Sequence, residues 1–138
     1  MANVVAKHSI SFELASKMVE AAAKKATALG VNQVIAVIDD TGYTKAFGRM
    51  DGAPLMCEEI AQSKAFTALF GLPTDQFYNA LKGEPSLVAG LFNRPRIAAF
   101  GGGLPIKIGN EIVGAIGVSG ATAEQDIECA QAALDLIK

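Results

Sequence analysis

The fold is decided by a hairpin signal that begins Val34-Ile35-Ala36-Val37-Ile38-Asp39-Asp40-Thr41-Gly42. Five apolar residues in a row predict a strand that is covered on both of its faces. The polar residues and the glycine that follow predict a turn, and residues 43–50 return as a second strand. Strands joined by so short a connection pair antiparallel. The chain is therefore expected to build an antiparallel sheet that helices cover.

A second hairpin is predicted nearer the C-terminal end. Residues 104–108 and 111–118 are typical of strands, and they flank Gly109-Asn110, a two-residue turn that tolerates positive φ. Gly114 and Gly117 leave room for an element packed closely against the second of these strands. Residues 96–100 are predicted to supply a fifth strand.

Helix signals separate these hairpins. Ser9 or Ser11 can cap a first helix that closes at Gly30, and Thr122 with Gln125 forms a capping box for the last one. Further helices are expected from Pro54 to Gly71 and over 74–81, and residues 74–96 as a whole are expected to be short helical turns and loop. The predicted fold is α+β, a five-stranded antiparallel sheet flanked by helices, formed by residues 1–138 as one domain.

Composition narrows the classes of function. Hydrophobic residues make up 51% of the 138 residues and charged residues 19%, and we interpret the apolar surplus as surface for other copies of the chain. A net charge of −2 gives no basic surface, which argues against nucleic acid and membrane as partners. The N-terminus lacks the pattern of a secretory signal, so a cytoplasmic location is expected. One histidine and two cysteines, Cys57 and Cys129, are too few for a Cys/His zinc site, and no metal site is predicted.

Charged residues gather at the predicted corner between the second strand and the second helix. Arg49 and Asp51 stand at the end of the strand, and Lys64 falls within the apolar stripe of the helix. A charge on an apolar face needs a partner or a route to solvent. One interpretation is structural, with an Arg49–Asp51 ion pair and a Lys64 amine that reaches the surface. The other is functional: Arg49 and Lys64 hold a carboxylate, and Asp51 orients one of them.

Glycine-rich turns are the second candidate feature. They are Gly52, Gly101-Gly102-Gly103 and Ser119-Gly120. Free backbone N–H groups in such turns can hold an anion. The alternative is that they are tight corners of a compact sheet.

His8 is the single histidine, and it precedes the first predicted helix. It is a candidate axial ligand for haem iron, and a surface or capping role is the alternative. The sequence contains no CxxCH motif, which excludes covalent attachment of the c type.

Several sequence blocks occur in the order known from one family. They are Ala36-Val37-Ile38-Asp39 with Gly42, Arg49-Met50-Asp51-Gly52-Ala53, Lys64-Ala65 with Thr67-Ala68, Gly102-Gly103 with Pro105, Gly114-Ala115-Ile116-Gly117-Val118-Ser119-Gly120, and Asp126. On these blocks the chain resembles the GlcG/HbpS-like family, which includes the C-terminal domain of PduO-type proteins. The resemblance implies a profilin-like sandwich and homo-oligomers from dimer to octamer. It also implies haem binding in some members, near the N-terminal helix or at a subunit interface, and catabolic operons for others.

Three hypotheses of function follow. The first is a cytoplasmic homo-oligomer that binds a small carboxylate-bearing ligand, such as haem, at Arg49, Asp51 and Lys64, with Gly102, Gly103 and Ser119 completing the pocket. The second is a cofactor-independent enzyme of the proton-transfer, isomerase/lyase or hydrolase type, which acts on a small carboxylated metabolite. There Lys64 or Asp51 moves the proton, and glycine-turn N–H groups stabilise the developing charge. The third is a non-catalytic accessory subunit of a catabolic operon.

Overall fold

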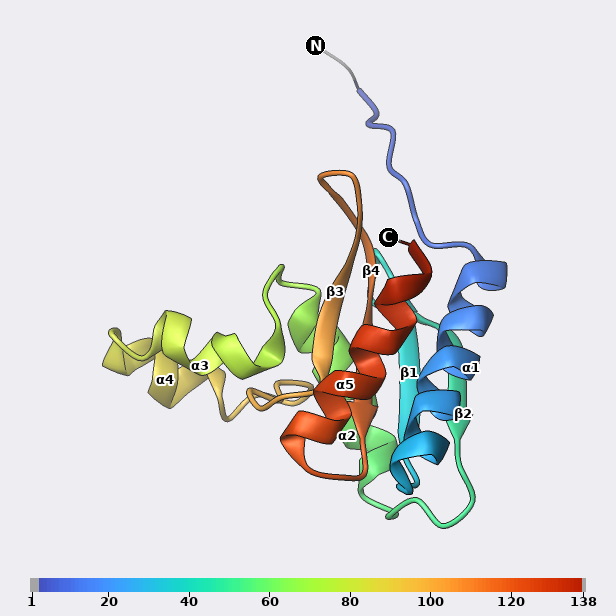
Figure 1. The fold of residues 1–138 in the computed structure, drawn as a ribbon. Coiled ribbons are helices and arrows are strands. Elements are labelled where there is room, and N and C mark those ends of the chain that lie inside the picture. The colour runs from blue at the N-terminus through green and yellow to red at the C-terminus, as the bar shows by residue number, and fades with distance from the viewer. Residues whose placement is uncertain (1–2, 138) are drawn as a thin grey trace.

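The computed structural model describes residues 3–137, which form one sheet with helices on both faces (Figure 1). In chain order the elements are α1 (Phe12–Leu29), β1 (Val34–Asp39), β2 (Thr44–Arg49), α2 (Cys57–Ala68), α3 (Thr74–Leu81), α4 (Pro85–Leu91), β3 (Gly103–Ile108), β4 (Glu111–Ser119), α5 (Ala123–Leu134) and a short 3-10 turn (Asp135–Ile137). The α+β class and both predicted hairpins are confirmed.

The sheet has the strand order β2-β1-β4-β3, and every neighbouring pair is antiparallel. On one face, Ile35 and Val37 of β1 pack with side chains of α1 and α5, which lie side by side in Figure 1. On the other face, Val34 and Ala36 pack with Cys57 and Ala61 of α2. The unbroken apolar run of β1 is therefore buried on both faces, as the sequence predicted.

The predicted fifth strand at residues 96–100 is wrong, and the part of the chain that the structure describes contains four strands. The hydroxyl of Thr67, on α2, donates to the Arg96 carbonyl at 3.0 Å and accepts from the Ala98 N–H at 2.9 Å. Arg96 also has a positive φ of 71°. These backbone groups bind a helix side chain and the chain turns sharply, so the segment does not join the ladder of β3.

The predicted close approach at the glycines of β4 is confirmed: α2 approaches Gly117, whereas a Cβ atom at Gly114 would meet the Ile38 carbonyl of β1 and the Ile10 side chain. A Cβ atom at Gly117 would lie 2.6 Å from the backbone nitrogen of Ala65, and nearer still to the carbonyl oxygen of Ala61. The second helix begins at Cys57 and not at Pro54. The reason is that the Cys57 and Glu58 N–H groups bond three residues back, to Pro54 and Leu55, in separate turns.

The helix boundaries at the two ends of the chain are also confirmed. The Ser11 hydroxyl accepts from the Leu14 N–H at 3.1 Å to begin α1, and Gly30 closes the helix with a φ of 74°. Thr122 and Gln125 form the capping box of α5. None of the helices within residues 3–137 is long and apolar enough to cross a membrane.

Candidate functional site

The most deeply buried charge is Lys64, whose residue is 1% exposed within the layer between α2 and the sheet. Its Nζ atom donates to the Asp126 carboxylate at 2.9 Å and to the Val118 carbonyl at 2.9 Å. The Phe100 ring lies over the same atom, with 5.2 Å from Nζ to the ring centroid. Lys64 therefore has its ion-pair partner inside the fold and does not extend to solvent.

Asp126, in the first turn of α5, collects contacts from three other segments. Besides Lys64, it accepts from the Gln33 Nε2 at 2.6 Å and from the Ala121 N–H at 3.1 Å. Burial raises the pKa of this carboxyl above its ordinary value, and the ammonium of Lys64 opposes that shift. Within residues 3–137, the Oε1 atom of Gln33 is a buried acceptor without a donor. The cluster ties α2, α5, β4 and the start of β1 together.

The residues predicted to complete a ligand pocket, Gly102, Gly103 and Ser119, lie next to this cluster, and their role in binding stays a prediction. Gly102 has a φ of 128°, and a Cβ atom there would lie 2.8 Å from the Lys64 Nζ. The Gly103 N–H donates to the Thr74 hydroxyl at 2.8 Å, so it is not free to hold an anion. Ser119 is 4% exposed and pairs with Val34 in the sheet.

Arg49 and Asp51 are exposed, and the structure does not bring Lys64 to them. Arg49 ends the edge strand β2 opposite Val34, whereas the bonds of Lys64 run to Val118 and Asp126. The predicted trio is thus divided between surface and interior. The roles predicted for Arg49, Asp51 and Lys64 in binding or catalysis stay predictions.

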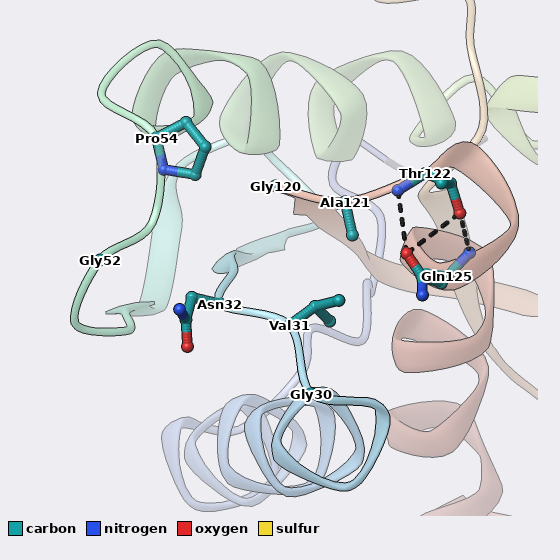
Figure 2. A pocket seen from close by; sticks show the side chains of 9 residues that line it. All are labelled: Gly30, Val31, Asn32, Gly52, Pro54, Gly120, Ala121, Thr122 and Gln125. Carbon is teal, nitrogen blue, oxygen red and sulfur yellow. Dashed lines mark hydrogen bonds between the residues drawn. The ribbon is translucent and has the colours of Figure 1, made fainter.

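An open hollow of about 460 Å³ lies next to this corner, and Figure 2 shows its lining. The residues are Gly30, Val31, Asn32, Gly52, Pro54, Gly120, Ala121, Thr122 and Gln125. At one side the Thr122 and Gln125 side chains cap α5, through the bonds drawn as dashed lines. The amide of Gln125 thus accepts from the Thr122 N–H and is already engaged in the cap.

His8 lies at a second hollow of about 380 Å³, between the segment before α1 and the β3–β4 hairpin. Its Nδ1 is 2.6 Å from the Glu111 Oε1, and its backbone N–H donates to the Glu111 Oε2 at 3.1 Å. These bonds from His8 hold the pKa of Glu111 below its ordinary value. The remaining lining is Ser9, Ile10, Ser11, Leu14, Ile108 and Val113. Sequence reasoning missed Glu111, because it is 103 residues from His8 and carries no motif.

The two hollows lie at opposite ends of α1. His8 precedes the first residue of the helix, and Gly30, which closes the helix, lines the hollow in Figure 2. The 18 residues of α1 span about 27 Å at 1.5 Å per residue. A single ligand therefore cannot contact both His8 and the Arg49 corner of one chain.

The donor set fits an axial ligand better than a protein-only metal site. Within residues 3–137, no three His, Cys, Asp or Glu side chains come together as a metal cluster. Haem iron needs only one or two protein ligands. If the carboxylate of Glu111 accepts the Nδ1 proton, the Nε2 of His8 is left with its lone pair for a metal.

Comparison with known proteins places this geometry in context. The family model described as "Haem degrading protein HbpS-like" matches residues 10–135. An uncharacterized 15.0 kDa protein from the dhaT-dhaS intergenic region of Citrobacter freundii is 39% identical over 129 residues, which are 92% of this chain and 91% of that protein. The crystal structure of Klebsiella pneumoniae protein ORFY has a TM-score of 0.91 at 37% identity and covers 99% of this chain and 96% of its own. The crystal structure of a PduOC:haem complex has a TM-score of 0.85 at 28% identity, with 94% and 96% covered.

Proposed function

The chain belongs to the HbpS-like family, and from this premise we propose that it binds haem through His8. The observation that carries the proposal is the 2.6 Å contact between His8 Nδ1 and Glu111 Oε1. The PduOC relative is a haem complex, which makes haem the first ligand to test on this chain.

The His8–Glu111 pair prepares the imidazole for an iron atom. A carboxylate on Nδ1 fixes the tautomer and orients the ring. The His8 side chain is 79% exposed, so Nε2 is accessible from solvent. Ile10, Leu14 and Val113 supply apolar surface in the same hollow. When bound, haem would supply an iron centre, and His8 would supply its axial ligand.

Self-association is part of the proposal. The hollow beside His8 is open and holds about 380 Å³, so it can cover only one face of a porphyrin. A second copy of the chain would cover the other face. We therefore propose a homo-oligomer, from dimer to octamer, and sedimentation velocity with and without haemin measures its size.

Haemin titration of the purified protein, with any affinity tag of histidines removed, tests the haem site. Because the chain holds one histidine, a histidine-ligated Soret spectrum can come only from His8. We expect a stoichiometric Soret shift in the wild type, its loss in His8→Ala, and its return when free imidazole is added to His8→Ala. Glu111→Gln should keep the haem but alter the iron spectrum and reduction potential, because a neutral acceptor withdraws less proton density from Nδ1.

Arg49→Gln is the matched control, because Arg49 lies at the other end of α1. It should leave the haem spectrum unchanged. A haem spectrum that is kept in His8→Ala but lost in Arg49→Gln would show that haem binds near Arg49, and it would overturn the assignment of His8 as the ligand. No Soret shift at one equivalent of haemin would remove haem binding altogether.

A second candidate function is placed near Arg49: binding of a small carboxylate-bearing ligand, or cofactor-independent catalysis on a small carboxylated metabolite. What favours it is that Arg49 is exposed, and no ion pair occupies it within residues 3–137. Lys64 is enclosed by Asp126, Val118 and Phe100, so proton transfer there would fall to Asp51. An accessory role without catalysis is the third proposal, and a cytoplasmic location stays a prediction.

A further inference from the structure

A third hollow, of about 320 Å³, lies away from both of these sites, where α2 meets α3 and α4. Apart from Thr67, all of its lining is apolar: Phe66, Leu69, Phe70, Phe77, Leu91 and Ile97. In Figure 1 these two short helices form an arm that projects from the side of the sheet. None of the residues of α4 is buried, so the arm covers the hollow only loosely.

The cavity has the size and character of a small-molecule site. Ligand pockets are mostly apolar, with few polar groups, and begin at about 300 Å³. An engineered apolar cavity of about 150 Å³ in another protein holds benzene. The hollow beside α3 therefore has room for one aromatic ring together with a short chain.

A cation stands beside this apolar lining. The guanidinium carbon of Arg96 is 3.9 Å from the centroid of the Phe66 ring, and Arg96 directly precedes Ile97. One of its N–H groups donates to the Gly42 carbonyl at 3.0 Å. A guanidinium has five N–H donors, and among residues 3–137 no carboxylate forms an ion pair with this one. Arg96 thus keeps donors available for an acidic ligand.

The backbone holds Arg96 in place at a conformational cost. Arg96 is the one non-glycine residue in the described part of the chain with positive φ, a conformation that is strained for a residue with a side chain. The Thr67 hydroxyl donates to the Arg96 carbonyl and accepts from the Ala98 N–H, and these two hydrogen bonds fix the segment against α2. The same side chain that prevents a fifth strand therefore sets the guanidinium over Phe66.

We propose that this hollow binds a small apolar monocarboxylate, with its hydrocarbon part among the aromatic side chains and its carboxylate on Arg96. The complementarity is of two kinds: an apolar cavity without a charged lining residue, and a cation at its edge with free donors. The proposal does not depend on haem, because His8 lines a different hollow.

Calorimetric titration with two probes of the same carbon skeleton, phenylpropionate and the neutral phenylpropanol, tests the site. The acid should bind more tightly than the alcohol. Arg96→Gln should weaken binding of the acid about tenfold, equivalent to about 1.4 kcal/mol, and leave the affinity for the alcohol unchanged. Glutamine tolerates positive φ no worse than arginine does, so the backbone strain is matched. Arg94→Gln, at an exposed arginine two residues earlier, is the control and should change neither affinity.

A second variant separates the cavity from the charge. Leu91→Phe, on the loosely packed α4, enlarges a lining side chain and should reduce the affinity of both probes while Soret binding of haemin is unaffected. Equal affinities for acid and alcohol, with no effect of Arg96→Gln, would overturn the role of Arg96. If neither probe binds, or if both bind Leu91→Phe as tightly as the wild type, the proposed site is wrong. Binding of neither probe is also the result expected if a second copy of the chain fills the hollow.

Discussion

Lys64→Met should destabilise the protein strongly, because it removes one partner of a buried ion pair. Methionine fills a similar volume but leaves the Asp126 carboxylate, at 3% exposure, with only the Gln33 amide and the Ala121 N–H. The Val118 carbonyl also loses its donor from Nζ. Breaking a buried pair in this way costs about 3–5 kcal/mol. For a domain whose net stability is typically 5–15 kcal/mol, the melting temperature should fall by roughly 10–20 °C.

The pH dependence identifies the cause. Burial already raises the pKa of Asp126, and without the Lys64 ammonium it should rise further. In folded Lys64→Met the Asp126 carboxyl then binds its proton more tightly than it does in the unfolded chain. The loss of stability relative to the wild type should therefore shrink as pH falls and grow as pH rises through the native pKa of Asp126. For the same reason Asp126→Asn, which is destabilising alone because it strands the ammonium, should partly rescue Lys64→Met.

Urea unfolding followed by circular dichroism gives the four stabilities of this double-mutant cycle. The coupling energy between the two sites should be at least about 2 kcal/mol. Lys24→Met, at an exposed lysine of α1, is the matched control and should change stability by less than about 0.5 kcal/mol. A loss under 1 kcal/mol for Lys64→Met at neutral pH, or additive effects of the two substitutions, would refute the reasoning.

Two further predictions concern packing and alkaline pH. Gly117→Ala should cost more than about 3 kcal/mol, since its methyl group would meet the Ala61 carbonyl and lie 2.6 Å from the Ala65 nitrogen. Gly90→Ala, which meets nothing within 4 Å, should be neutral or stabilising in the same urea assay, and equal losses would contradict the close approach of α2. Burial raises the pKa of Cys129 from 9.0 to about 11, so the native thiol stays protonated where the unfolded one ionises. Stability should be unaffected below pH 9 and fall toward pH 11 by roughly 2–3 kcal/mol relative to Cys129→Ala, and parallel curves for the two proteins would count against it.

The elements that sequence predicted correctly are those in which neighbouring residues carry the whole signal. The apolar run of β1, the Gly109-Asn110 turn and the Thr122–Gln125 box each act within a few residues, and all three are confirmed. The strand at 96–100 failed for the opposite reason. Its backbone partner is the Thr67 hydroxyl, 29 and 31 residues away, and no local pattern reveals such a bond.

The same distinction explains the candidate site. A charge within the apolar stripe of a helix indicates that a partner exists, and Lys64 was singled out on that ground. The stripe does not identify the partner, and the sequence-based prediction groups Lys64 with Arg49 and Asp51. Its carboxylate belongs to Asp126, 62 residues away. The Glu111 partner of His8 was missed in the same way.

Exposure then separates groups that hold the fold from groups that can hold a ligand. The Lys64 ammonium is buried, and its bonds to Val118 and Asp126 join α2, β4 and α5. His8 and Arg96 have the opposite arrangement. His8 is held by Glu111 and keeps its Nε2 atom available, and Arg96 is held by Gly42 and Phe66 and keeps N–H donors available. A binding residue must be held in position and still have unused bonding capacity. On this criterion His8 and Arg96 are the better candidates to test for ligand binding, while the Lys64–Asp126 pair joins α2 to α5.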